Sequence, residues 1–277
     1  MAIQKSGRLH DDSINLLKNC GIKFGNGVGK LRAESRNFPI EIYFLRDDDI
    51  PEYVADGVAD IGIVGENVVF ESQKNVEVVE QLGFGKCRLS IATPKAFVYN
   101  GLQSLDNKRI ATTYPNLLST YLLANNVKAE IHTISGSVEI APSIGLADAV
   151  CDLVSSGSTL FSNGLQEVET VMKSEAILIS QLNLDENARQ ILAKLMFRIK
   201  AVNSAKQNKY ILLNAPNDKR DEIIQLLPGI KSPTILPLAE SGWSSVHSVI
   251  NESDFWEVVE KLKLAGAEGI LVLSIDQ

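Results

Sequence analysis

Apolar residues near the start of the chain recur at the spacing of an amphipathic helix. Ile14, Leu16 and Leu17 are apolar within a polar stretch, and Gly21 follows them at the place where a glycine ends many helices. A short apolar strand at Ala2–Ile3 precedes the helix. The chain is therefore expected to open with a strand, a polar turn and a helix.

Short apolar runs after this helix have the composition of buried strands. Ile40–Leu45 is rich in β-branched and aromatic residues, and Ile61–Val64 is continuously apolar. Between them, Asp47–Pro51 combines carboxylates with a proline, and both favour a helix N-terminus. Strands that alternate with helices predict an α/β fold.

One pattern occurs twice along the chain. Gly57–Asp60 leads into the strand Ile61–Val64, and Gly145–Asp148 leads into a second strand at Ala149–Val154; a glycine-bearing loop follows each strand. Two similar α/β lobes that face a cleft explain the repeat, and so does recurring turn chemistry between helices and strands.

The last part of the chain has a different order of elements. Strand, helix, strand, strand, helix and strand are expected at Tyr210–Leu213, Lys219–Leu227, Thr234–Leu238, Ser245–Ile250, Phe255–Leu264 and Gly269–Ile275. This βαββαβ order is that of ferredoxin-like domains. The polar stretch Ala201–Lys209 is interpreted as the linker before it, with a domain boundary near residue 203.

Composition and charge narrow the class of protein. The 277 residues include 27 Lys+Arg and 34 Asp+Glu, a net charge of −7, which disfavours nucleic-acid binding but allows a local basic pocket. No apolar run reaches the roughly 18–20 residues of a membrane span, and no signal sequence opens the chain. Cys20, Cys87 and Cys151 lie far apart, which is typical of reduced thiols, so a cytoplasmic location is expected. The three histidines are equally scattered and predict no metal site.

The strongest local signal for chemistry is a hydroxyl-rich loop after the strand Ala149–Val154. The loop consists of Ser155, Ser156, Gly157, Ser158 and Thr159. Backbone N–H groups and hydroxyls converge in such a loop, as binding of a phosphate requires. Asp152, in the strand, can accept hydrogen bonds from sugar hydroxyls beside that phosphate. A Ser/Gly loop that only caps a helix is the alternative.

Two carboxylates lie upstream of this strand. Glu139 falls on a presumed helix and Asp148 in the turn before the strand. Each can border a cleft and meet ribose hydroxyls or a metal. For Glu139 the alternative is stabilisation of the first turn of its helix.

Cations flank several of the predicted strands. Lys5 and Arg8 follow the first strand, Arg46 follows Ile40–Leu45, and Lys86 and Arg88 lie at the start of another strand. Ligands of α/β folds gather at the carboxyl ends of strands, where Lys and Arg can meet a polyphosphate. Solvated turns are the alternative interpretation.

Motifs along nearly the whole chain carry a resemblance to a known family. The matching segments are Gln4–Leu9, Arg46–Pro51, Asp60–Asn67, Gly85–Leu89, Arg109–Thr112, Gly136–Pro142, Gly145–Leu165 and Lys231–Leu238. The longest, GLADAVCDLVSSGSTLFSNGL, is very specific. The chain resembles ATP phosphoribosyltransferase of the long, regulated form, the first enzyme of histidine biosynthesis.

The resemblance implies a reaction. N1 of ATP joins C1 of the ribose in 5-phosphoribosyl 1-pyrophosphate (PRPP), and pyrophosphate leaves with Mg²⁺ present. The sugar–pyrophosphate bond breaks through an oxocarbenium-like state, so Mg²⁺ and cationic side chains must stabilise the departing negative charge. N1 of adenine already carries a lone pair, so no strong general base is required.

The resemblance also implies an architecture. It predicts an α/β, two-lobed, periplasmic-binding-protein-like catalytic body and a C-terminal ferredoxin-like βαββαβ regulatory domain. The first lobe comprises residues 1–90 with 177–200, the second residues 91–176 with the PRPP loop, and the regulatory domain residues 203–277. Homo-oligomers are expected, as dimers that associate into hexamers, without a separate activating subunit.

The site residues follow from the matched motifs. We expect the hydroxyl-rich loop to hold the PRPP 5′-phosphate, and the carboxylates Glu139, Asp148 and Asp152 to meet the ribose. The cations are expected to bind the pyrophosphate or the ATP phosphates. Lys5 and Arg8 are the main candidates, and Arg46, Lys86 and Arg88 are secondary ones.

Feedback inhibition by histidine is implied by the regulatory domain. Ser232–Thr234 matches a motif there, and Thr234, Asn214 and Gly269 are candidates for the effector pocket. An acidic residue near position 214 would pair better with the histidine ammonium group. Strand-end turn chemistry is the alternative for all three.

Two other functions remain open on the sequence. A two-lobed sensor that binds a small anion would show binding without PRPP turnover. Another enzyme on the same scaffold would not account for the hydroxyl-rich loop next to Asp152.

Overall fold

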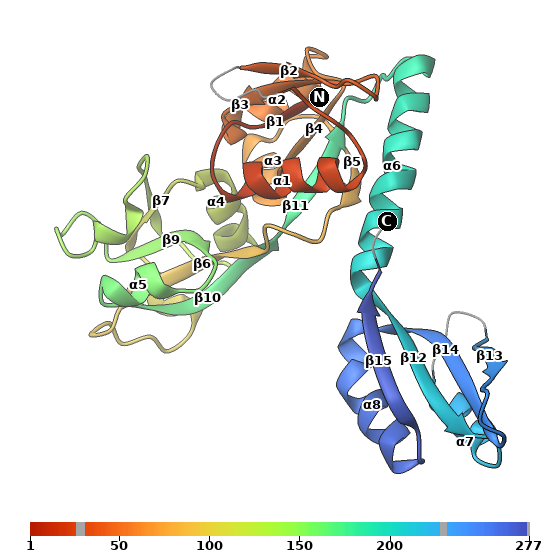
Figure 1. The fold of residues 1–277 in the computed structure, drawn as a ribbon. Helices are drawn as coiled ribbons and strands as arrows, with labels where there is room; N and C mark the ends of the chain where they lie inside the picture. Colours follow the sequence, from red (N-terminus) through yellow and green to blue (C-terminus); the bar gives the residue numbers. More distant parts are fainter. Residues whose placement is uncertain (26–30, 228–231, 276–277) are drawn as a thin grey trace. The chain divides into compact units, whose positions relative to one another are not determined.

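The structure, a computed structural model, describes residues 1–25, 31–227 and 232–275 (Figure 1). The chain divides into two compact units, Met1–Leu192 and Ala193–Gln277. The first unit contains two sheets and the second contains one, each with helices packed against it. The α/β class predicted from the sequence is confirmed.

The first sheet has the strand order β2-β3-β1-β4-β11-β5. In that order its strands span Arg32–Glu34, Glu41–Leu45, Ala2–Gln4, Ile61–Gly65, Ala176–Ser180 and Glu77–Gln81. β3, β1 and β4 run parallel, so their carboxyl ends lie at one edge. The associated helices are α1 (Arg8–Asn19), the 3-10 turn η1 (Asp47–Asp49), α2 (Ile50–Ala55) and α3 (Glu66–Ser72).

The second sheet has the strand order β10-β6-β9-β7-β8. Its strands span Leu165–Ser174, Cys87–Pro94, Ala149–Val154, Arg109–Thr112 and Glu130–Thr133. β9, β7 and β8 are parallel, whereas β6 is antiparallel to both β9 and β10. Its helices are α4 (Pro115–Ala124) and α5 (Ser158–Ser162), with 3-10 turns η2 (Leu102–Leu105) and η3 (Val138–Ile140).

The chain crosses between these two sheets twice. It leaves the first sheet after β5 to enter β6, and it returns from β10 directly into β11, which lies between β4 and β5 (Figure 1). The first sheet is therefore built from two separate parts of the sequence. This is the two-lobed, periplasmic-binding-protein-like arrangement that was expected, while the residue bounds given for the lobes stay predictions.

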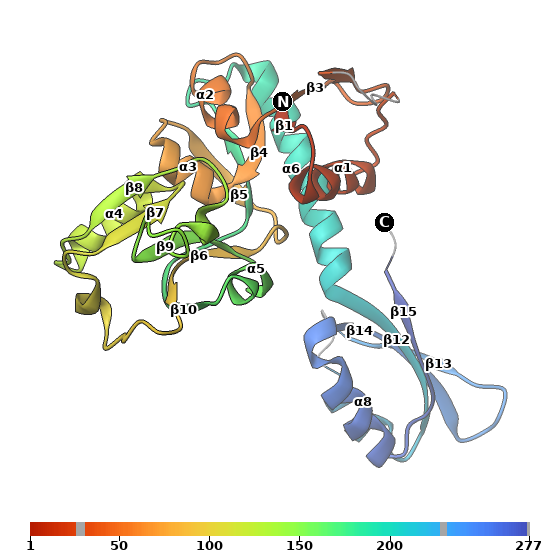
Figure 2. The ribbon, with the colours of Figure 1, turned by 90° about the vertical axis from the view of Figure 1, so that its left-hand side faces the viewer.

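The second unit contains an antiparallel sheet of order β13-β14-β12-β15. Its elements are β12 (Asn208–Pro216), α7 (Arg220–Gln225), β13 (Thr234–Pro237), β14 (Trp243–Asn251), η4 (Glu252–Asp254), α8 (Phe255–Leu264) and β15 (Glu268–Ser274). Ile211, Leu213 and Val246 pack with residues of α7 and α8 on one face of the sheet; Figure 2 shows α8 beside it. The predicted ferredoxin-like domain is confirmed, and the predicted helix Phe255–Leu264 has the bounds of α8.

Two predicted elements are wrong. The stretch Ala201–Lys209 is not a linker, because helix α6 (Glu186–Gln207) continues through it and β12 begins at Asn208. Ala201, Val202 and Lys206 all have propensities compatible with a helix, and the side chain of Val202 is buried. The helix presumed at Glu139 is only the 3-10 turn η3, followed by turns as far as Gly145.

Candidate functional site

A cavity of about 520 Å³ lies between the two sheets of the first unit. Gln4, Arg8 and Asp47 line it from the first sheet, and Leu153 and Ser155 line it from the second. These residues lie at the carboxyl ends of β1, β3 and β9 or just beyond them. Ligands of open α/β sheets bind at this edge, so the cavity is the candidate substrate site.

The hydroxyl-rich loop begins at this cavity, which its first residue, Ser155, lines. β9 ends at Val154, the loop turns at Gly157 with φ 82°, and α5 begins at Ser158. An L side chain is strained at this positive φ, which accounts for the glycine. The hydroxyls of Ser156 and Ser158 lie 3.0 Å apart, and both residues are exposed. The loop thus presents hydroxyls toward solvent and is anchored by the buried Leu160.

Two of the three predicted carboxylates, Asp152 and Glu139, influence each other electrostatically. Asp152 is half-buried, and its Oδ1 accepts the N–H of Leu153 at 2.8 Å. Burial raises the pKa of Asp152, and the nearby charge of Glu139 raises it further. The two charges therefore repel each other, and the charge of Asp152 is poorly compensated in the protein alone.

Asp148 lies away from the loop and is paired with Arg109. Its Oδ1 and Oδ2 accept hydrogen bonds from the Arg109 guanidinium at 3.1 and 3.3 Å, and Oδ2 also accepts the Arg109 backbone N–H at 2.9 Å. These hydrogen bonds lower the pKa of Asp148. Asp148 precedes β9, whereas the loop follows it, so the two lie at opposite ends of the strand. The structure thus pairs Asp148 with Arg109, and its expected contact with the ribose stays a prediction.

Arg8 connects the two sheets across the cavity. It is the first residue of α1, and its Nη1 donates to Ser155 Oγ at 3.4 Å. Lys5 and Arg46 lie just beyond the carboxyl ends of β1 and β3, which pair side by side. Both side chains are exposed. The structure therefore gathers these three cations at one edge, with Arg8 aimed at the loop.

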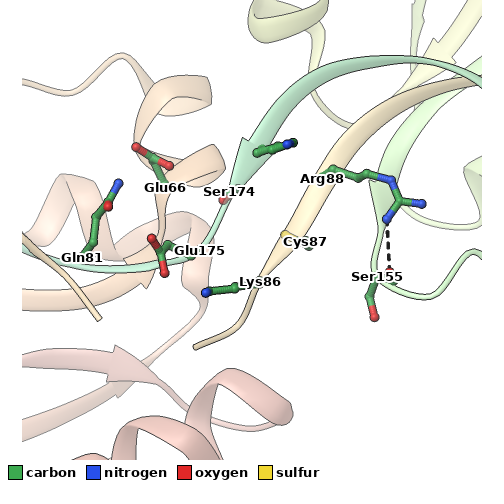
Figure 3. A pocket seen from close by; sticks show the side chains of 9 residues that line it. Glu66, Gln81, Lys86, Cys87, Arg88, Ser155, Ser174 and Glu175 are labelled. Atoms are coloured by element: carbon green, nitrogen blue, oxygen red, sulfur yellow. Dashed lines mark hydrogen bonds between the residues drawn. The ribbon is translucent and has the colours of Figure 1, made fainter. Parts of the chain in front are cut away.

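Lys86 and Arg88 lie beside a second cavity of about 500 Å³, which shares Lys86, Cys87 and Ser155 with the first. In Figure 3 Arg88 points to Ser155, while Glu66 and Glu175 lie on the other side of the cavity. Arg88 Nη1 donates to the Ser155 carbonyl oxygen at 3.3 Å.

Two residues at the site were missed in the sequence. Glu167, on β10, accepts hydrogen bonds from Arg88 Nε and Nη2. Tyr114 follows β7 at the start of α4, and burial together with the charges of Asp152 and Asp47 raises its pKa. An aromatic residue after a strand and before Pro115 was a usable signal for Tyr114. No local pattern marks Glu167, because its partner lies on another strand.

The effector candidates lie on the sheet of the second unit. A Cβ at Gly269 would approach Asn214 Nδ2 to 3.1 Å, so these two residues are neighbours. Strand register pairs Asn214 with Glu268 on one side and with Ser245 on the other. Thr234 is on the edge strand β13, separated from β12 by β14. The structure thus joins Asn214 and Gly269 but does not bring Thr234 against them.

Among the described residues, no group of three or more His, Cys, Asp or Glu side chains is arranged to bind a metal ion. No helix in the described ranges combines the length and the apolar character needed to cross a membrane.

Sequence comparisons identify close relatives. The profile of the ATP phosphoribosyltransferase family matches residues 46–201, and that of the HisG C-terminal domain matches residues 205–277. An ATP phosphoribosyltransferase from Cytophaga hutchinsonii is 63% identical, covering 100% of this chain and 97% of its own length. One from Bacteroides fragilis is 54% identical, with 100% and 98% coverage.

Solved structures agree with these relatives. A chain of the HisG:HisZ ATP phosphoribosyltransferase complex from Thermotoga maritima superposes with a TM-score of 0.61 and 28% identity, covering 72% of this chain and 98% of that one. The arginine-bound protein Tv2483, at 15% identity and a TM-score of 0.50, shares the fold alone; the match covers 74% of this chain and 84% of that one. With matches along its full length, this chain belongs to the ATP phosphoribosyltransferase family, the pentosyltransferases of the first step of histidine biosynthesis.

Proposed function

We propose that the cavity between the two sheets is the active site and that the Ser155–Thr159 loop binds the 5′-phosphate of PRPP. The family's reaction joins N1 of ATP to C1 of the PRPP ribose and releases pyrophosphate. One observation supports the placement above the others: Ser155, the first residue of the loop after β9, lines the cavity, and Arg8 from the other lobe reaches it. Arg8 then approaches the substrate from the opposite wall.

Asp152 and Glu139 are proposed to accept hydrogen bonds from the ribose hydroxyls. Burial and the charge of Glu139 raise the pKa of Asp152 in the free protein, and hydroxyl donors would stabilise the charged form. The ribose is then fixed at two points, by its phosphate and by its hydroxyls. Such positioning leaves C1 open to the incoming N1 of ATP.

The departing pyrophosphate needs positive charge. Arg8 and Lys86 line the cavity, and Lys5 and Arg46 lie at its first-sheet edge. We assign these four cations to the pyrophosphate or the ATP phosphates. Arg88 is excluded from this group because Glu167 already compensates its charge.

Mg²⁺ is proposed as the metal of the reaction. Protein sites for this ion provide one or two carboxylates, and substrate phosphates complete its shell. Asp152, next to the cavity-lining Leu153, and Glu139, whose charge acts on Asp152, provide carboxylate oxygens of this kind, so they are the residues that would hold it. When bound, the ion neutralises charge on the pyrophosphate.

Pyrophosphate release from ATP, PRPP and Mg²⁺ tests the activity. Release that requires both nucleotide and PRPP is expected from the purified full chain. Binding of PRPP without release would favour the two-lobed sensor instead. No binding and no release from folded protein would contradict the proposed active site.

Histidine is proposed to inhibit by binding to the regulatory sheet near Asn214 and Gly269. The residue at 214 carries no charge, but Glu268 is its register partner on β15, and cross-strand partners share a face. Glu268 thus provides the carboxylate that an ammonium group needs. Inhibition acts on catalysis only if histidine prefers one arrangement of the enzyme over another.

A pair of variants tests this site in the full chain. Glu268→Gln is expected to weaken inhibition by histidine about tenfold, the value of one hydrogen bond to a charged group, while leaving uninhibited pyrophosphate release unchanged. Glu257→Gln, on the exterior of α8, is the matched control. Unchanged inhibition in Glu268→Gln would place the ammonium group elsewhere.

Assembly into homodimers that associate into hexamers is also proposed, together with a cytoplasmic location. The chain carries its own C-terminal domain, and Leu271 and Leu273 of β15 are more than half exposed. Light scattering of the purified protein measures the assembly. A monomer at all concentrations would contradict it.

A further inference from the structure

A network of hydrogen bonds crosses three neighbouring strands beneath the hydroxyl-rich loop. Arg88 on β6 donates from Nε and Nη2 to the two carboxylate oxygens of Glu167 on β10. Ser90, also on β6, donates to Glu167 Oε1 at 2.7 Å. The remaining Arg88 nitrogen, Nη1, donates to the carbonyl oxygen of Ser155 after β9.

The two-pronged pairing fixes the orientation of Arg88. A guanidinium group is planar, so a carboxylate that binds two of its nitrogens also sets the direction of the third. That third nitrogen is the one directed at Ser155. Both partners are partly shielded, with exposed side-chain fractions of 34% for Arg88 and 25% for Glu167.

The hydrogen bond to the Ser155 carbonyl sets the direction of one backbone donor of the loop, the N–H of Ser156. In a trans peptide the C=O and the next N–H point in opposite directions, and the structure contains no cis peptide among its described residues. Holding the Ser155 carbonyl toward Arg88 therefore directs the N–H of Ser156 away from Arg88. A backbone N–H held in one direction costs less to order when a phosphate binds.

The charge balance separates Arg88 from the free cations of the site. Hydrogen bonds from Arg88 and Ser90 lower the pKa of Glu167 below its usual value, so the carboxylate is charged near neutral pH. The charged pair is neutral overall and offers a phosphate little net attraction. Its contribution is geometric.

We propose that Glu167 is a positioning residue for PRPP, which it serves by holding Arg88 against the Ser155 carbonyl and thereby setting the peptide plane between Ser155 and Ser156. This proposal rests on the assignment of the loop to the PRPP 5′-phosphate. Glu167 touches no substrate in this account, so its removal affects the binding of PRPP and leaves the binding of ATP unchanged.

Steady-state kinetics of Glu167→Gln in the full chain test the proposal. The expected result is a KM for PRPP raised about tenfold, the value of one hydrogen bond to a charged group, with kcat within about twofold and the KM for ATP unchanged. Glu169→Gln is the matched control, because Glu169 lies on the same strand and accepts a hydrogen bond from Tyr99 away from the loop. This control is expected to leave the KM for PRPP unchanged.

Two outcomes would overturn the proposal. An unchanged KM for PRPP in folded Glu167→Gln would show that the loop does not depend on the pair. A lowered KM would show that Arg88, once released, binds phosphate itself.

A second variant, Arg88→Lys, tests the same pair if Glu167→Gln does not fold. It keeps the positive charge but lacks the planar guanidinium group that donates two parallel hydrogen bonds, and it is expected to raise the KM for PRPP by a similar factor. The double variant is expected to be no worse than either single one, because the two residues act as one unit. Additive effects would contradict the proposal.

Failure of the positioning role can be distinguished from failure of the assignment of the loop to PRPP. If Gly157→Trp abolishes PRPP binding but Glu167→Gln does not raise the KM, only the positioning role fails. If Gly157→Trp binds PRPP normally, the loop assignment fails first.

Discussion

The two ends of strand β9 carry an aspartate each, and their surroundings differ. At the amino end, Asp148 accepts hydrogen bonds from the backbone and the side chain of Arg109, whose Nη1 also donates to the Gly145 carbonyl at 3.0 Å. Toward the carboxyl end, Asp152 accepts the N–H of Leu153 and lies near a second negative charge, Glu139. The pKa of the first is lowered and that of the second is raised.

This difference separates a carboxylate whose charge the protein pairs from one whose charge it leaves largely uncompensated. Asp148 has its charge satisfied by the protein, so it stabilises the fold and has little capacity for a ligand. Burial and Glu139 both disfavour the charged form of Asp152, and groups perturbed in this way are candidates for functional sites. Both residues are aspartates of one short segment, and their partners in the fold distinguish them.

The largest effect is expected from blocking the loop at the carboxyl end. Gly157→Trp should abolish detectable PRPP binding and pyrophosphate release, because the indole occupies the loop and the residue is strained at φ 82°. Titration calorimetry with PRPP measures it. Gly164→Trp is the matched control, since Gly164 has φ 70° and open space around it but follows α5. Equal loss of binding in both variants would show that the effect is a general one on this lobe.

Removing the charge of Asp152 should give the next largest effect. Asp152→Asn is expected to lower kcat/KM for PRPP roughly 10- to 100-fold, the range for hydrogen bonds to a charged group. The thermal midpoint should change little, because the protein itself provides Asp152 with few partners. Normal kcat/KM for PRPP would remove Asp152 from the ribose site and end the contrast between the two strand ends.

The matched change at the other end should have the opposite profile. Asp148→Asn is expected to lower the thermal midpoint at neutral pH and to leave the KM for PRPP unchanged. Because Arg109 lowers the pKa of Asp148, the stabilisation is present above the ordinary value of 3.8 and disappears as the pH falls through the lower pKa of the folded state. The difference in midpoint between the two proteins should therefore shrink in acid. A raised KM for PRPP would return Asp148 to the site.

The smallest effect concerns the pH profile. The charge of Glu139 raises the pKa of Asp152, so Glu139→Gln should move the acid limb of kcat/KM for PRPP to lower pH. The ionisation of PRPP itself is common to both proteins and cancels in the comparison. An acid limb that stays in place or moves to higher pH would show that Asp152 does not control it.

Sequence reasoning succeeded where a feature is local. The strand Ala149–Val154, the loop after it and the helix Phe255–Leu264 follow from apolar runs, turn residues and periodicity within short windows. The family resemblance added the order of the lobes, which no local pattern contains. The helical continuation through Ala201–Gln207 was missed because polar residues of an exposed helix resemble those of a loop.

The residue partners could not be predicted. The pairing of Asp148 with Arg109 depends on the register between β9 and β7, and that of Arg88 with Glu167 on the register between β6 and β10. The β6–β10 ladder contains two irregularities, between Glu167 and Glu169 and between Thr170 and Met172. Because of them, the register between β6 and β10 cannot be predicted from the spacing of residues in the sequence. The strand that carries a charged residue was thus predictable, but its partner on a neighbouring strand was not.

A crystal structure of the full chain with PRPP tests the central claim most directly. The account predicts the 5′-phosphate within hydrogen-bonding distance of the Ser155–Thr159 loop, with the ribose hydroxyls at Asp152 and the Arg109–Asp148 pair intact. A phosphate bound elsewhere in the cavity, or a ribose at the amino end of β9, would contradict it.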